Sequence, residues 1–298
     1  MEQMRVVDYT GTQIKLAQSA RRIVCLTAAG LDILLELDLE PVGYLTKGVA
    51  NNPEFYGERA KQFKPVGSWI APNWKAVRKL NPDLILGWSF PHRFYRRWIG
   101  NAAPLNLMGG TGYKAEIQRQ RDVAQLTNRV SQAEAAVIQF ENRLENYCSA
   151  IPTQEYKTVL FMGGSSLNYL SRKFMIETNI GTFGSIMRKF SHYPWVEPEK
   201  YNNEPGLTNI SLQQILEVDP DVIFVQTYPP SKASLSKQLS VNRIWQQIKA
   251  VQTHKVYEID QLWHSGNGTR MMGITLDKIM PLIYPDFITP YNKSLGAN

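Results

Sequence analysis

Apolar residues recur at alternating steps of three and four through one long stretch in the middle of the chain, from Lys114 to Cys148. This spacing is typical of a helix with a single apolar stripe. With a rise of about 1.5 Å per residue, an uninterrupted helix of this length would extend for about 50 Å, more than one small domain needs. We therefore predict one long rigid helix that joins two bodies. Its stripe consists of Val123, Leu126, Val130, Ala133, Val137, Phe140, Leu144 and Tyr147.

On each side of this helix the chain repeats the same order of elements. An apolar run of strand length ends in small residues, a helical stretch follows, and a Pro-Asp step leads into a second apolar run. Val24 precedes Pro82 by nearly the same number of residues as Leu160 precedes Pro220, which indicates a weak internal repeat. Alternating strands and helices predict an α/β fold of two lobes with mostly parallel sheets and a ligand cleft between the lobes. The predicted domains are an N-terminal α/β lobe over 1–113, the connecting helix over 114–148 and a C-terminal α/β lobe over 149–298.

Composition and charge narrow the classes of partner. The chain of 298 residues is 43% hydrophobic and 20% charged, which is ordinary for a folded globular protein. Its net charge is +7, and the first 113 residues hold 14 basic against 9 acidic residues. An anionic ligand or surface suits this charge, but no run of Lys and Arg follows the pattern of a phosphate-tracking segment, so we expect no nucleic-acid partner.

Other features of the sequence predict little chemistry. Cys25 lies in an apolar strand and Cys148 closes the long helix, so we expect free thiols rather than a disulfide or a metal pair. No apolar run of membrane-spanning length occurs, and Met1 opens on polar sequence without a signal-peptide core. The protein is therefore expected to be cytoplasmic, or to have lost an export segment.

Aromatic and basic residues recur where the predicted strands end. The segment from Trp88 to Trp98 alternates aromatic rings with guanidinium groups directly after the clearest strand of the first lobe, Leu84 to Gly87. Ligands of open α/β sheets bind at the carboxyl ends of the strands, so we expect these side chains to line a ligand cleft. A helix with an aromatic inner face and solvated arginines is the alternative for this segment. The candidate ligand-binding residues are Trp69, Trp88, Arg93, Arg96, Tyr169, Arg172, Trp195, Tyr228, Trp263 and Arg270.

These residue types indicate the chemistry of the ligand. A guanidinium donates two parallel hydrogen bonds to carboxylate, hydroxamate or catecholate oxygens, and it also stacks on aromatic rings. Tryptophan and tyrosine would cover apolar faces of the same molecule. The expected ligand is bulky, partly apolar and anionic.

Four stretches resemble successive motifs of the periplasmic binding proteins for iron-siderophores and vitamin B12, over about residues 20 to 285. They are RIVCLTAAGLDILLELDLEPVGY, PVGSWIAPNWKAVRKLNPDLILGW, NISLQQILEVDPDVIFVQ and IWQQIKAVQTHKVYEIDQLW. The resemblance implies a monomeric solute receptor of an ABC importer, in the periplasm or on the cell surface as a lipoprotein. It also implies a ligand held between two lobes, little hinge motion, and iron that arrives already wrapped by its siderophore, so that the protein supplies no metal ligand and holds no cofactor.

The sequence departs from this family at the two positions where a glutamate commonly docks onto permease arginines. The matching residues are Lys75 and Gln213. Neighbouring acids could replace them, namely Glu54, Glu58 or Glu217. Alternatively, the protein has a scavenging or storage role without a permease.

Other functions stay open on the residues alone. A direct metal receptor would use His92, His192 and His264, which all fall on predicted cleft loops. Haem could be bound through Tyr169 or a histidine, and cobalamin binding would suit the same family. An enzyme is the least favoured reading, because no nucleophile-elbow pattern occurs and the two cysteines are too far apart for a cluster site.

Overall fold

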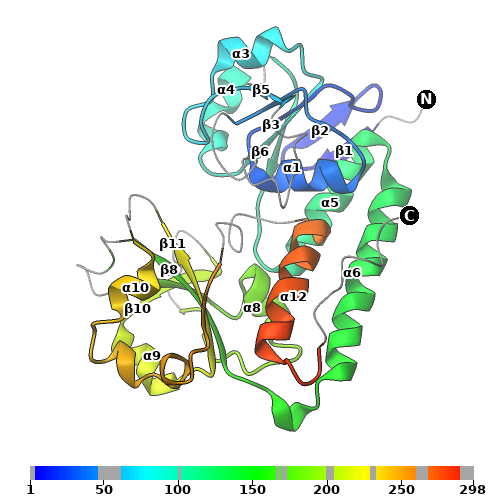
Figure 1. Cartoon of the computed structure of the whole chain (residues 1–298). Coiled ribbons are helices and arrows are strands. Elements are labelled where there is room, and N and C mark those ends of the chain that lie inside the picture. Colours follow the sequence, from blue (N-terminus) through cyan, green and yellow to red (C-terminus); the bar gives the residue numbers. More distant parts are fainter. Residues whose placement is uncertain are drawn as a thin grey trace. The chain divides into compact units, whose positions relative to one another are not determined.

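The computed structural model divides the chain into two compact units (Figure 1). Unit 1 comprises residues 1–110, 114–141 and 265–271, and unit 2 comprises residues 111–113, 142–264 and 272–298. Each unit holds one five-stranded sheet with helices, which confirms the α/β class. The residues that the structure describes are 4–45, 62–99, 102–165, 168, 173–198, 205–228, 233–259 and 268–288.

Unit 1 is built on an all-parallel sheet whose strand order is β5-β4-β3-β6-β7. The strands are β3 (Ile23–Cys25), β4 (Gly43–Tyr44), β5 (Lys64–Pro65), β6 (Leu84–Trp88) and β7 (Leu105–Met108). An antiparallel hairpin precedes this sheet and consists of β1 (Met4–Val7) and β2 (Gln13–Leu16). The connecting helices of this unit are α1 (Ala28–Glu36), α3 (Trp74–Lys79), the 3-10 turn η3 (His92–Tyr95) and α4 (Arg96–Ile99).

Unit 2 has a mixed sheet of order β10-β9-β8-β11-β12, in which β8, β11 and β12 are parallel and β9 is antiparallel to both of its neighbours, β8 and β10. Its strands are β8 (Val159–Gly164), β9 (Phe174–Glu177), β10 (Leu207–Ile210), β11 (Val222–Thr227) and β12 (Val256–Glu258). Phe224 on β11, between β8 and β12, stacks on Phe161 at 5.2 Å and on Tyr257 at 5.7 Å between ring centroids. The helical segments of this unit are η4 (Thr153–Glu155), α8 (Thr182–Met187), α9 (Leu212–Val218), α10 (Leu235–Leu239), η5 (Trp245–Gln247) and α11 (Lys249–Gln252).

The two Pro-Asp steps serve the same purpose in both units. The carboxylate of Asp83 accepts hydrogen bonds from the backbone N–H groups of Arg21 and Arg22 at 2.8 and 2.9 Å, just before β3. The carboxylate of Asp221 accepts one from the backbone N–H of Thr158 at 2.8 Å, just before β8. Each aspartate also donates its own backbone N–H to the facing carbonyl, at 2.9 Å in both units. The aspartate thus fixes the start of two neighbouring parallel strands, which is the physical content of the repeat.

The predicted single helix is instead two helices, α5 (Tyr113–Thr127) and α6 (Val130–Ala150). Asn128 between them has φ +56°, and the N–H of Arg129 bonds to the carbonyl of Ala124 at 2.8 Å, which is the pattern of a Schellman cap. Asparagine adopts this left-handed conformation more easily than most residues, so the apolar stripe did not reveal the break. Arg121 on α5 forms a two-pronged ion pair with Glu134 on α6 at 2.7 and 2.8 Å. Residues 13 apart in a straight helix could not touch, so the chain folds back at Asn128 (Figure 1).

The last helix, α12 (Thr269–Ile283), begins in unit 1 and continues in unit 2. Its amino end is capped by side chains from distant elements. The carboxylate of Asp32 on α1 accepts from the N–H groups of Gly268 and Met271 at 2.8 and 3.2 Å, and Gln120 on α5 accepts from Thr269. No helix in the described ranges combines the length and apolarity needed to cross a bilayer.

Replacement of Asn128 should separate the cost of the left-handed turn from other effects. Asn128→Ala should lower the free energy of unfolding by about 1 kcal/mol, because a Cβ without a compensating polar group is strained at φ +56°. Asn128→Gly, the matched control, should leave it within about 0.5 kcal/mol of the original, since glycine accepts this conformation. Urea unfolding followed by circular dichroism measures both. An alanine variant as stable as the glycine variant would contradict the assigned turn.

Candidate functional site

The segment that follows β6 is organised by His92. The backbone N–H of Trp88 donates to His92 Nδ1 at 2.9 Å, and this leaves the proton on Nε2, which donates to the carbonyl of Trp69 at 2.9 Å. Burial lowers the pKa of His92, although its bond to Trp69 acts in the opposite direction, so the neutral ring is favoured. Gly87 makes room for this ring, because a Cβ there would lie 3.0 Å from Nδ1. His92 therefore joins the loop after β6 to the loop after β5.

A second contact between the same two loops comes from Tyr95. Its hydroxyl donates to the carbonyl of Ile70 at 2.8 Å, and its ring lies 5.7 Å from that of Trp74. Both Trp74 and Tyr95 pack against the buried cluster under the sheet, which includes Val77, Ile85 and Ile99. The loops are thus held by the core, and the side chains at their tips are left free to face outward.

Large apolar side chains are exposed on these two loops. Trp69 is 40% exposed, Ile70 62%, Phe90 59% and Phe94 64%. The guanidinium of Arg93 lies over the Phe94 ring at 4.8 Å, and Phe90 meets Phe94 edge to face at 5.9 Å. Apolar groups exposed together in this way commonly mark a binding site. We call these five residues the strand-end surface: Trp69, Ile70, Phe90, Arg93 and Phe94.

Trp88 and Arg96 lie beside this surface and have partners within unit 1. Trp88 is half-buried at the end of β6, where the guanidinium of Arg119 lies 4.9 Å from its ring. Arg96 forms an ion pair with Asp8, which lies just after β1. Burial acts to raise the pKa of Asp8, but its bonds to Thr10, Arg96 and backbone N–H groups outweigh burial, and the pKa lies below its usual value. We therefore leave Arg96 out of the strand-end surface.

The predicted ligand residues of unit 2 are in different environments. Tyr228 is half-buried after β11 and lies over Gly163 of β8, where a Cβ would come within 2.3 Å of its hydroxyl. Trp195 is only 5% exposed, and its indole N–H donates to the carbonyl of Val159 at 2.7 Å. Packing and this hydrogen bond account for Trp195 as a core residue, which corrects its expected place on a cleft loop. Tyr169, Arg172 and Trp263 lie outside the described residues.

Arg270 is tied to the start of α12. Its Nε lies 2.9 Å from a carboxylate oxygen of Asp32, and its side chain is 24% exposed. The aspartate is fully buried and caps the same helix. Arg270 thus balances a buried charge in unit 1.

The histidines expected for a metal site are not brought together in the described ranges. His92 has both ring nitrogens engaged, and exposed His192 packs its ring against Tyr156 at 5.8 Å. His264 lies outside the described residues, and among the described ones no group of three His, Cys, Asp or Glu could hold a metal ion. Cys25 is buried and Cys148 half-buried, and both are free thiols as expected. Burial raises the pKa of both.

Sequence reasoning missed part of the site. From the segment 88–98 it selected Trp88, Arg93 and Arg96, whereas the structure also exposes Phe90 and Phe94 there, together with Ile70 on the other loop. Their joint exposure could have been predicted from the sequence, because Phe90 and Phe94 are one helical turn apart and so lie on the same face. The pairing of Arg96 with Asp8 joins residues far apart in the sequence and left no local signal.

Known proteins resemble this chain both in sequence and in fold. The chain is 25% identical to the probable siderophore-binding lipoprotein YfiY of Bacillus subtilis, over 90% of this chain and 84% of that protein. Its fold is similar to that of the petrobactin-binding protein YclQ of B. subtilis, with a TM-score of 0.78, 17% identity and coverage of 95% and 99% of the two chains. The B. subtilis protein FeuA in complex with ferri-bacillibactin gives a TM-score of 0.74 at 19% identity, with coverage of 94% and 98%.

A family model covers most of the chain as well. The model described as periplasmic binding protein matches residues 23–262, which include both sheets and both Pro-Asp steps. This match confirms the family that the four sequence motifs indicated. The chain belongs to the periplasmic binding protein family.

Proposed function

We propose that this protein captures a ferric siderophore, an anionic and partly apolar iron chelate, for import by an ABC transporter. The observation that carries the proposal is the strand-end surface, which combines exposed aromatic rings with the guanidinium of Arg93 at the carboxyl end of the unit 1 sheet. Relatives support the ligand class, because YfiY is named as a probable siderophore-binding lipoprotein and FeuA was crystallised with ferri-bacillibactin.

The surface suits such a ligand physically. The iron arrives inside its chelator as cargo, so the protein needs to match only the outside of the complex. Arg93 would offset negative charge on the chelate oxygens, while Trp69, Phe90 and Phe94 would cover its apolar faces. Because His92 and Tyr95 already fix the two loops, the backbone would lose little conformational freedom on binding.

Direct binding of a bare metal is the weaker alternative. His92 could serve as a ligand only after giving up its bonds to Trp88 and Trp69. Family members are substrate-binding transport proteins, and we propose the same non-enzymatic role here. Haem and cobalamin belong to the competing ligands in the binding experiment below.

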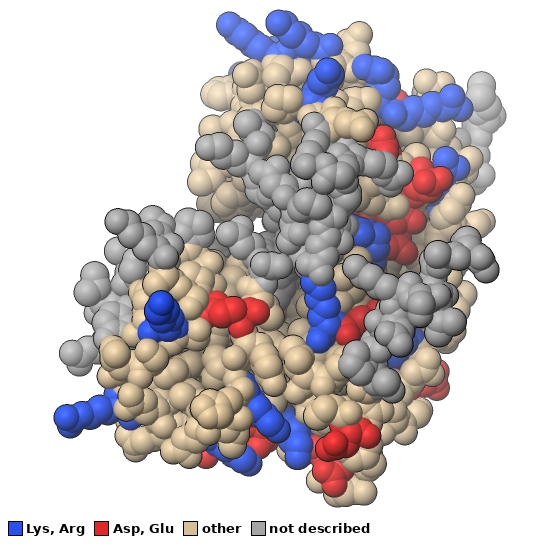
Figure 2. All heavy atoms as spheres, in the orientation of Figure 1, with Lys and Arg blue, Asp and Glu red and all other residues tan. Residues whose placement is uncertain are grey.

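Delivery to a permease is proposed with an altered docking surface. Lys75 and Gln213 are both exposed, and each is the second residue of its helix, α3 in unit 1 and α9 in unit 2. This equivalence supports the pairing of the two positions inferred from sequence. Lys and Arg side chains gather at the top of Figure 2, where Figure 1 places α3. A permease surface that receives this face would carry acidic rather than basic residues there. We place the protein in the periplasm or on the cell surface as a lipoprotein, as its relatives are named.

Tryptophan-fluorescence titration tests the proposed function. The panel comprises ferric hydroxamate, citrate-hydroxamate and catecholate siderophores, with haem, cobalamin, free Fe(III) and Zn(II) alongside. Saturable quenching by one ferric siderophore class at sub-micromolar concentration is the expected result. Saturation by haem, cobalamin or a bare metal alone would overturn the proposal.

Arg93→Ala should weaken binding of that ferric siderophore at least about tenfold, because a charge-assisted contact with the chelate would be lost. Arg5→Ala is the matched control, since Arg5 is an exposed arginine on β1 of the same unit, and it should bind as the unchanged protein does. The dissociation constants come from the fluorescence titration. Equal affinity of the two variants would remove Arg93 from the site.

Arg96→Ala should act mainly on stability. It would leave the buried carboxylate of Asp8 without its ion-pair partner, and we expect the free energy of unfolding to fall by about 1–3 kcal/mol. Urea denaturation measures this loss, and binding is then measured well below the unfolding midpoint. A stable variant that loses affinity as Arg93→Ala does would place Arg96 in the ligand site instead.

The buried neutral state of His92 predicts a dependence of stability on pH. Its pKa is lower in the folded than in the unfolded chain, so on acidification the unfolded chain takes up a proton first and the free energy of unfolding falls from about pH 7 to about pH 5. His92→Gln should be less stable at neutral pH but show a flatter slope over this range. His192→Gln, which replaces an exposed histidine, should keep the original slope. An unchanged slope in His92→Gln would contradict the assignment.

A further inference from the structure

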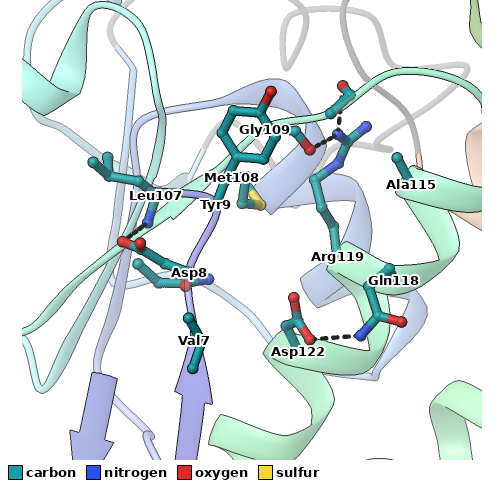
Figure 3. A pocket seen from close by; sticks show the side chains of 12 residues that line it. Val7, Asp8, Tyr9, Leu107, Met108, Gly109, Ala115, Gln118, Arg119 and Asp122 are labelled. Atoms are coloured by element: carbon teal, nitrogen blue, oxygen red, sulfur yellow. Dashed lines mark hydrogen bonds between the residues drawn. The ribbon is translucent and has the colours of Figure 1, made fainter. Parts of the chain in front are cut away.

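Unit 1 contains a cavity of about 320 Å³ (Figure 3). It lies between the end of β1, the end of β7 and the first turns of α5. Among the residues that the structure describes, none that is predicted to bind the ligand lines it, and neither does any member of the strand-end surface. The lining residues that matter for a ligand are Tyr9, Asn106, Leu107, Met108, Arg119 and Asp122.

The frame of the cavity is fixed by hydrogen bonds. Asp8 accepts from the backbone N–H groups of Thr10 and Thr12 at 2.9 and 3.0 Å, and the backbone N–H of Leu107 donates to its other oxygen at 3.2 Å. The backbone N–H of Tyr9 donates to the carbonyl of Leu107 at 3.0 Å. The Tyr9 ring covers Gly109 so closely that a Cβ there would lie 2.2 Å away. The hairpin is therefore locked to β7, and the cavity is part of the folded unit.

Of the charged side chains that line the cavity, Asp8 and Arg119 each form an ion pair with a neighbouring residue, whereas no ion pair of Asp122 is found among the described residues. Asp8 is paired with Arg96, and Arg119 is paired with Glu116. Arg119 also donates to the carbonyls of Gly109 and Gly110 at 2.5 and 3.1 Å, and its remaining Nε is fully buried, so the cavity does not reach it.

Asp122 is only partly satisfied. One carboxylate oxygen accepts from the Gln118 amide at 2.8 Å. In Figure 3 the other oxygen points into the space between Asp8 and Arg119. Burial raises the pKa of Asp122, although Gln118 and Arg119 act against it. A partly desolvated carboxylate of this kind would be stabilised by a cation that enters the cavity.

Asn106 gives the cavity a second polar group. Its side chain lines the cavity and is only 3% exposed, yet it hydrogen-bonds to no other residue in the described parts of the chain. An amide that lines a cavity can both donate and accept hydrogen bonds, so a polar group of a ligand could bond to it. The walls around it are largely apolar, through Leu107, Met108 and Ala115.

We infer that this cavity binds a small organic cation with N–H donors, such as a primary ammonium compound. The ammonium group donates to the free oxygen of Asp122, a polar group of the ligand meets Asn106, and its carbon body lies against Leu107 and Met108. Tyr9 at the mouth adds the face of an aromatic ring. This site is separate from siderophore capture and does not depend on it.

Other ligand classes fit the cavity less well. A bare metal ion would need several oxygen ligands, whereas both oxygens of Asp8 are already occupied and, in the described ranges, no group of three His, Cys, Asp or Glu is present. An anion would face the carboxylate of Asp122 without a free guanidinium, because Arg119 is turned to Glu116 and the glycine carbonyls.

Three probes of the same size test the inference on the full chain: n-butylammonium, 1-butanol and butyrate, at equal concentration and ionic strength. Saturation-transfer NMR detects binding, and a titration gives the dissociation constant. We expect saturable binding of n-butylammonium only. Equal transfer to 1-butanol, or none to n-butylammonium, would overturn the inference.

Variants locate the bound probe. Asp122→Asn should weaken n-butylammonium binding at least about tenfold, while the control Asp286→Asn, at an exposed aspartate of unit 2, should leave it unchanged. Asn106→Leu should narrow the cavity and remove its amide, and so weaken binding, while an unchanged melting temperature would show that the variant is folded. Unchanged binding in Asp122→Asn, or in a folded Asn106→Leu variant, would place the probe elsewhere.

Discussion

The carboxylates of Asp83 and Asp221 fix the pairing on which the rest of each unit depends. Each bonds to backbone N–H groups at the start of the first strand, while its own backbone pairs with that strand. Parallel neighbours have no hairpin to set their register, so a side chain that fixes both strand starts is an effective substitute. The two steps also share their backbone conformation, because Asn81 and Asp219, which directly precede the two prolines, are both left-handed.

Fixing the strand starts also fixes where the strands end. In unit 1, β6 ends at Trp88, and the neutral ring of His92 then binds both Trp88 and the Trp69 loop. His92 and Tyr95 face inward and hydrogen-bond to the backbone of the two loops. The exposed rings and Arg93 therefore remain on the outer side of the same loops. The proposed binding residues therefore lie on loops, and the sheet beneath these loops determines their positions.

Local patterns in the sequence predicted the α/β class, the repeat and the strand from Leu84 to Gly87. They could not predict the turn at Asn128, because the apolar spacing continues across it while the conformation of one residue reverses the chain. The site was predicted at the level of a segment, 88–98, rather than of side chains. Arg96 and Trp195 find their partners, Asp8 and Val159, only in the tertiary structure, and such pairing leaves no periodic signal.

Oxidative footprinting of the chain with its tightest-binding ferric siderophore, read by mass spectrometry, tests the central claim most directly. The ligand should protect Trp69, Phe90 and Phe94 from hydroxyl radicals, because their exposed rings would be covered. Tyr9, an exposed aromatic residue of unit 1 that does not belong to the strand-end surface, should react as before. Full reactivity of Trp69, Phe90 and Phe94 in the saturated complex would contradict the account.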